Sequence, residues 1–95
     1  MTTLPIPENS SVAVMDVALA KLYNVILFND EHHTADEVVA QIIKAIHCPS
    51  PEADRIMLEA HSTGRAIVIT AGLERCEHVE SVLQQIRLGT KIEQA

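Results

Sequence analysis

The stretch YNVILFNDEHHT, residues 23–34, changes abruptly from apolar to polar side chains. Its first six residues are mostly β-branched, aliphatic or aromatic, and after Asn24 apolar side chains occupy both faces of an extended chain. This pattern predicts a strand that is buried on both sides. The five residues from Asn29 to His33 are all polar. The strand therefore ends in a turn that is either an ordinary polar turn or a place where a positive group is bound.

A helix is predicted directly after this turn. Thr34 can cap it, and Glu37, three residues later, completes a capping box. The helix should end at Cys48, because the next residue is Pro49 and a residue before proline avoids the helical region. The apolar side chains follow the helical spacing and form one broad face, made of Val38, Val39, Ile42, Ile43 and Ile46.

A second helix and further elements are predicted along the rest of the chain. Ser50 supplies a capping hydroxyl and Pro51 suits the first helical position. Gly64 is free to adopt the left-handed conformation that ends a helix. The remaining elements are a strand at residues 66–71, a third helix at 74–87 and a short strand in the stretch LGTKIE at 88–93.

The predicted order is therefore β-α-α-β-α-β. It indicates an α+β fold, a two-layer sandwich in which a three-stranded antiparallel sheet carries three helices on one face. Ninety-five residues are enough for one such domain. We expect residues 1–21 to form a flexible tail, because they contain two prolines, Asn9 and a pair of serines, and residues 22–95 to form the domain.

Thirteen acidic and seven basic side chains give the chain a formal net charge of −6. This balance disfavours nucleic acid and anionic membranes as partners, since few cations are present to neutralise phosphates, and it favours cationic ligands. Two cysteines do not make a disulfide framework, which indicates a reducing compartment. No apolar run approaches the roughly 20 residues of a membrane span, and the first residues do not follow the pattern of a secretory signal.

A histidine elsewhere in the chain changes the interpretation of the polar turn. His61 lies four positions after Met57 and therefore shares the face of the second helix that packs inward. If the first two helices form an antiparallel hairpin, His61 approaches the polar turn. The result would be a rim of amide, carboxylate and imidazole acceptors, which suits the three donors of an alkylammonium group. The rim would consist of Asn29, Asp30, Glu31 and His61, beside an apolar wall of Ala35, Val38, Met57 and Ala60.

These residues resemble a known family. YNVILFND at 23–30, the His of IMLEAH at 56–61 and the following GRAIV at 64–68 are similar to the ClpS adaptors. ClpS adaptors deliver N-degron substrates, which are recognised by their first residue, to the AAA+ unfoldase of a bacterial or plastid Clp protease. The resemblance covers about half the chain. It implies the β-α-α-β-α-β fold, and we expect no catalytic residue, no cofactor and no bound metal. The first residues do not resemble an Arg-rich transit peptide, so we expect the bacterial cytoplasm rather than the plastid stroma.

The resemblance also implies roles for single residues. Asn29, Asp30 and His61 match the residues that hold the α-amino group and first peptide unit of the substrate. Glu31 falls where the family has a second acid at the rim. The positions that would line the pocket for the first side chain are Ala35, Val38, Met57, Ala60 and Leu88.

The implied partners are of two kinds. Substrates would be peptides and proteins that begin with Leu, Phe, Tyr or Trp, with Ile and Val as further candidates. Glu74 and His78, in the third helix, would lie on the face that docks the N-domain of a ClpA- or ClpC-type unfoldase. The N-terminal tail corresponds to the segment that such adaptors thread into the unfoldase, and the protein should be a monomer.

Three departures from the family pattern bear on specificity. Ala35 stands where the family commonly has Met, and Ala60 replaces a commoner Val, so we expect an enlarged pocket with an altered preference for the first side chain of the substrate. Each methylene of fit in such a pocket changes the binding free energy by ~1–3 kcal/mol. His33-Thr34 replaces a Thr-Pro-like pair. We expect the rings of His32 and His33 to be solvated, with weaker binding at mildly acidic pH as the alternative. The last helix and strand are short, which puts docking to the unfoldase in question. A divergent ClpS paralogue would account for all three departures.

Other functions remain open. The chain could be a ClpS-like regulator of the unfoldase that does not deliver N-degrons. His61 and Asp30 could serve an enzyme as base and orienting acid, although no nucleophile accompanies them. A metal could be bound by His32, His33, His61 and Asp30, although their spacing matches no usual ligand framework.

Overall fold

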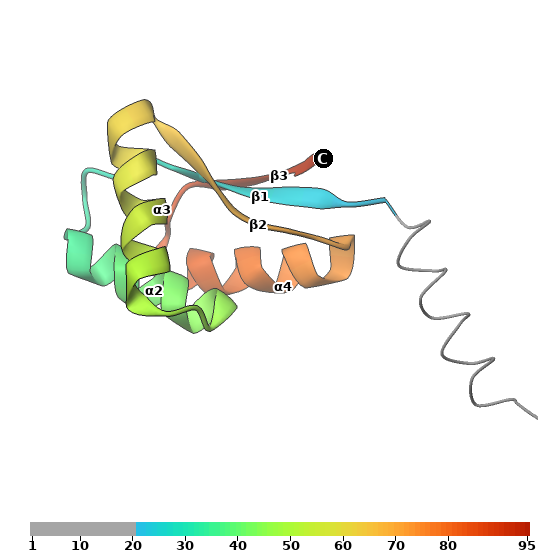
Figure 1. The fold of residues 1–95 in the computed structure, drawn as a ribbon, viewed down its shortest axis with the longest axis horizontal. Coiled ribbons are helices and arrows are strands. Elements are labelled where there is room, and N and C mark those ends of the chain that lie inside the picture. The colour runs from blue at the N-terminus through green and yellow to red at the C-terminus, as the bar shows by residue number, and fades with distance from the viewer. Residues whose placement is uncertain (1–20) are drawn as a thin grey trace, which may run out of the picture.

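The structure is a computed structural model that describes residues 21–95. The predicted tail therefore lies outside the described residues, apart from Lys21. In chain order the elements are β1 (Tyr23–Phe28), α2 (Ala35–Ile46), α3 (Ser50–Thr63), β2 (Arg65–Ala71), α4 (Leu73–Leu83), the 3₁₀ turn η1 (Gln84–Ile86) and β3 (Thr90–Gln94). The predicted α+β fold and its β-α-α-β-α-β order are confirmed (Figure 1).

The three strands form one antiparallel sheet in the order β2-β1-β3, so β1 is the central strand. Val25 and Leu27 point from β1 into a core shared with all three helices. Ile26 lies between them, on the face opposite these two side chains, and it pairs with Ile67 of β2 and Lys91 of β3. All three side chains of this apolar run are at most 1% exposed. The predicted burial of the first strand on both faces is therefore confirmed.

The start of α2 follows the predicted capping box. The backbone amide of Glu37 donates to Thr34 Oγ1 at 3.1 Å, and the amide of Thr34 donates to Glu37 Oε1 at 2.8 Å. The helix ends at Ile46, two residues earlier than predicted, because His47 adopts a left-handed conformation with φ 56°. The backbone amide of His47 donates to the carbonyl of Ile43 and so closes the last turn.

The predicted cap of α3 is wrong by one residue. Ser50 is already helical, Pro49 occupies the cap position in extended conformation, and no side chain caps this end. The fixed φ of proline suits a residue that enters a helix, which explains the earlier start. At the other end, Gly64 is left-handed with φ 97° and its amide donates to the carbonyl of Ala60, as predicted.

The helix predicted at residues 74–87 is shorter than expected. It ends at Leu83, the next three residues tighten into η1, and Arg87 turns the chain with φ 64°. This reversal brings Leu88 into the core and places Gly89 against the side chain of Phe28. The carbonyl of Gly89 accepts a hydrogen bond of 2.9 Å from the amide of Phe28, so β3 pairs with the end of β1.

Candidate functional site

The polar turn at residues 29–33, here called the acceptor turn, is held against the end of α3. Phe28, the last residue of β1, pairs with Arg65, the first residue of β2. The next amide, that of Asn29, donates to the carbonyl of Gly64 at 3.0 Å. Because Gly64 ends α3, this pairing brings the acceptor turn close to His61 in the last turn of that helix.

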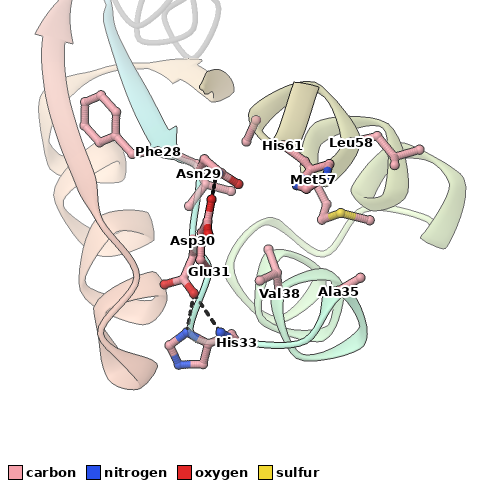
Figure 2. A pocket seen from close by; sticks show the side chains of 12 residues that line it. Phe28, Asn29, Asp30, Glu31, His33, Ala35, Val38, Met57, Leu58 and His61 are labelled. Atoms are coloured by element: carbon pink, nitrogen blue, oxygen red, sulfur yellow. Dashed lines mark hydrogen bonds and ion pairs between the residues drawn. The ribbon is translucent and has the colours of Figure 1, made fainter. Parts of the chain in front are cut away.

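A hollow of about 540 Å³ lies between the acceptor turn, α2 and α3 (Figure 2). We call it the main hollow. It contains all four residues predicted for the rim and four of the five predicted for the side-chain pocket. The residues that line it are Leu27, Phe28, Asn29, Asp30, Glu31, His33, Ala35, Val38, Met57, Leu58, Ala60 and His61.

The apolar part of the main hollow comes from β1, α2 and α3. Leu27, Val38 and Ala60 are almost fully buried, whereas Met57 is half-buried. Ala35 is exposed at the first position of α2. Leu88 does not line this hollow and is a buried member of the hydrophobic core.

The carboxylate of Asp30 is already used inside the acceptor turn. Its Oδ1 accepts the backbone amides of His32 and His33, each at 2.7 Å, and the ring Nδ1 of His33 at 3.0 Å. Figure 2 shows this carboxylate turned toward the His33 ring. Burial of Asp30 alone would raise its pKa, but these hydrogen bonds outweigh burial and hold the pKa below its ordinary value. Asp30 therefore braces the turn as an anion.

Glu31 and His61 are the freer acceptors of the rim. Both side chains belong to exposed residues. Glu31 Oε2 accepts one hydrogen bond from the side-chain Nδ2 of Asn29, at a long 3.3 Å. Within residues 21–95 the ring of His61 has no hydrogen-bond or ion-pair partner. An amide oxygen, a carboxylate and an imidazole thus face one hollow with bonding capacity to spare.

The expectation that both turn histidines are solvated is wrong for His33. His32 is exposed, but the His33 side chain is only 20% exposed and lies beside the Asp30 carboxylate. The sequence did not identify His33, Leu27, Phe28 or Leu58 as lining residues. Leu58 could have been found from its spacing, because it lies three positions before His61 on the same helix.

The residues predicted for unfoldase docking do not lie in the main hollow. Glu74 and His78 are both exposed on α4. No group of three or more metal-ligating side chains is found among the described residues. Over the same range, no helix is long and apolar enough to cross a membrane.

The family of the chain follows from comparison with known proteins. Residues 18–90 match the family model described as ATP-dependent Clp protease adaptor protein ClpS. The chain belongs to the ClpS family. The description of the family is that of an adaptor of the ATP-dependent Clp protease. The match extends past the resemblance seen in the sequence and includes α4 and the start of β3.

Two relatives show the extent of the similarity. The ClpS adapter of Gloeobacter violaceus is 38% identical over 73 residues, which is 76% of this chain and 78% of that protein. The ClpS adapter of Synechococcus elongatus is 33% identical over 76 residues, covering 79% of this chain and 80% of the relative.

A solved structure supports the fold. Agrobacterium tumefaciens ClpS2 bound to L-phenylalaninamide matches with a TM-score of 0.74 at 22% identity. The match covers 79% of this chain and 98% of ClpS2. It confirms the family fold for this chain, including the three helices on one face of the sheet.

Proposed function

We propose that this ClpS-family chain binds the free α-amino group and apolar first side chain of N-degron substrates and delivers them to a Clp unfoldase. One observation carries the proposal: acceptors from β1's end and α3 meet at the rim of a hollow whose inner wall is apolar. An ammonium group needs charge-assisted acceptors, and the attached side chain needs apolar contact. The phenylalaninamide held by the related ClpS2 has this chemistry, a free amine beside an aromatic side chain.

The four predicted rim residues divide into two roles. Asn29, Glu31 and His61 have unused bonding capacity and are the proposed ligands of the α-amino group and first peptide unit. Asp30 contributes negative charge at the rim, but its Oδ1 is occupied by three donors of the turn. Because this carboxylate is turned toward the His33 ring, we assign Asp30 mainly to holding the turn in shape, with Oδ2 still able to accept, and Glu31 to direct contact with the ammonium group.

The small side chains Ala35 and Ala60 are proposed to set the first-residue preference. Ala60 is 2% exposed at the apolar wall, whereas Ala35 stands at the opening beside the acceptor turn. With Val38 and Met57 they leave room for a branched or aromatic side chain in the hollow of about 540 Å³. We propose that the chain accepts Leu, Phe, Tyr and Trp and also tolerates Ile and Val. Because each methylene of fit changes the affinity by ~1–3 kcal/mol, the preference should be graded and not absolute.

Delivery is proposed to use surfaces outside the main hollow. Glu74 and His78 on α4 are exposed and available to an unfoldase N-domain of the ClpA or ClpC type. Residues 1–21 are the proposed delivery tail and residues 22–95 the binding domain. The relatives named above are bacterial, which supports action in a bacterial cytoplasm.

Fluorescence anisotropy tests the binding proposal. Labelled peptides that differ only at residue one, with Leu, Phe, Tyr, Trp, Ile, Val or Ala, are titrated with the protein. We expect free-amine Leu and Phe peptides to bind and N-acetylated Leu peptide to lose most of the affinity. Glu31→Gln should weaken the binding of free-amine peptides more than the binding of acetylated peptides. Equal binding of free and acetylated peptides would contradict the proposal.

A further inference from the structure

His33 belongs to the walls of two hollows. It lines the main hollow and also a second hollow of about 430 Å³, which is lined by His33, Glu37, Ala40, Gln41, Gln85, Ile86 and Arg87. We propose that His33 positions the acceptor turn and, through its own charge, makes the binding of the substrate's amino group sensitive to pH. This inference rests on the proposed function and assigns a regulatory residue to the same site.

The positioning role follows from the contacts of Asp30. Three donors meet on one carboxylate oxygen, and the His33 ring is the only one of them that a substitution can remove without altering the backbone. The side chains of His33 and Asp30 are 20% and 10% exposed, so water has limited access to replace the contact. Loss of the ring should therefore loosen the turn that carries Asn29 and Glu31.

The proton on His33 can be placed from the chemistry of its partner. An ionised carboxylate only accepts hydrogen bonds, so Nδ1 of His33 must carry the hydrogen that points to Asp30 Oδ1. The other ring nitrogen, Nε2, is then the atom that gains or loses a proton. The contact with Asp30 survives in both states, and only the charge of the ring changes.

Asp30 is held in its ionised form by the turn. Burial raises the pKa of Asp30, but the hydrogen bonds from His33 and the turn more than offset this and keep the pKa below its ordinary value. Histidine is the side chain whose charge ordinarily changes between pH 5 and 8.

The charges around His33 decide the direction of the effect. Asp30 and Glu31 in the turn are negative, and His61 faces the same hollow from α3. Across the second hollow stand Glu37 of α2, which also caps that helix, and Arg87 after η1. Protonation of His33 adds a positive charge at the wall of the hollow that receives the ammonium group, so it should weaken binding.

Two variants separate positioning from charge. His33→Asn keeps a side-chain donor close to the position of Nδ1 but cannot become charged, whereas His33→Ala removes both the donor and the charge. Affinities of a free-amine Leu peptide for the full chain are measured from pH 5.5 to 8.5, with urea unfolding as the folding control. The peptide affinity of wild type should fall as the pH falls. His61 is present in all three proteins, so the difference between them reports on His33.

At pH 8 we expect His33→Asn to bind like wild type and His33→Ala to bind about fivefold more weakly. When the pH is lowered from 8 to 5.5, the affinity of wild type should fall about threefold to tenfold more than the affinity of His33→Asn. A full wild-type pH dependence in His33→Asn would overturn the charge role, and wild-type affinity of His33→Ala at pH 8 would overturn the positioning role. Failure of the proposed function is distinct, because free and acetylated peptides would then bind alike at every pH.

Discussion

The two adjacent acids of the acceptor turn, Asp30 and Glu31, should differ in what their replacement affects: stability for Asp30 and ligand affinity for Glu31. Asp30→Ala removes an oxygen that accepts two backbone amides and the His33 ring. Unmaking such bonds at a side chain that is 10% exposed should lower the free energy of unfolding by ~1–3 kcal/mol. Glu31 is exposed and accepts one long hydrogen bond, so Glu31→Gln should change the free energy of unfolding by no more than ~0.5 kcal/mol.

For ligand affinity, the substitution of Glu31 should have the larger effect and the substitution of Asp30 the smaller one. A hydrogen bond to a charged group is worth ~1.5–3 kcal/mol, so Glu31→Gln should weaken a free-amine Leu peptide by about tenfold to a hundredfold. Asp30→Asn is the matched control, because its amide oxygen can still accept the two backbone amides while the charge is lost. It should retain most of the stability and weaken the peptide less than Glu31→Gln does.

Urea unfolding and fluorescence anisotropy on the same four proteins decide between these roles. The reasoning is refuted if Glu31→Gln binds the peptide like wild type while Asp30→Asn abolishes binding at unchanged stability. Asp30 would then contact the ammonium group directly, and its bonds within the turn would be incidental to the fold.

Four further outcomes are expected. Ala35→Met should narrow the main hollow and lower the affinity for Ile and Val peptides by ~1–3 kcal/mol more than the affinity for Leu peptides, in the same anisotropy assay. An equal loss of affinity for all peptides would contradict a role of Ala35 in selecting the first residue. Thr34→Ala should cost ~1 kcal/mol in urea unfolding, because it removes the hydroxyl that caps α2, and Thr34→Ser should retain most of that stability. Gly64→Ala should cost ~1–2 kcal/mol from its φ of 97° alone, since an added Cβ would meet no atom within 4 Å; an unchanged unfolding midpoint would show that the turn can relax. Because the pKa of Asp30 is lowered from 3.8, its stabilisation is complete above that pH and is lost as the pH falls through the lower folded-state value, so Asp30→Asn should lose less stability than wild type in acid unfolding.

The parts of the fold that could be predicted depend on short-range patterns. Thr34 and Glu37 form the predicted capping box because both partners lie within one helical turn. The continuous apolar run around Ile26 predicted a strand with two buried faces. The spacing of Met57 and His61 placed the histidine on the inward face of its helix, and an antiparallel pairing of the first two helices brought it near the turn. The capping box and the face on which His61 lies are determined by residues close in sequence, whereas the approach of His61 to the turn also needs the distant pairing of Asn29 with Gly64.

The errors in the element boundaries have both distant and local causes. The end of α4 is set by the need to bring Leu88 into the core and to pair Gly89 with Phe28, and neither contact is visible in the helical pattern. For α3 the start shifted by one residue, a local choice between Pro49 and Ser50 that the sequence left undecided.

The detailed bonding of the site was also beyond the sequence. Four acidic or basic residues follow one another from Asp30 to His33, and their order does not say which pair will meet. The structure shows that Asp30 bonds with His33 and leaves Glu31 with capacity for a ligand. The side-chain conformations of this turn therefore distinguish the acid that bonds within the turn from the acid that we propose as a ligand of the amino group.

The most direct test of the central claim is chemical-shift mapping of ¹⁵N-labelled protein with a free-amine Leu peptide and its N-acetylated twin. The account predicts shifts confined mainly to residues 27–38 and 57–64 with the free amine, and weak shifts with the acetylated peptide. Equal shifts with both peptides, or shifts that lie on α4 and leave the acceptor turn unaffected, would contradict the claim that this hollow binds an α-amino group together with its first side chain.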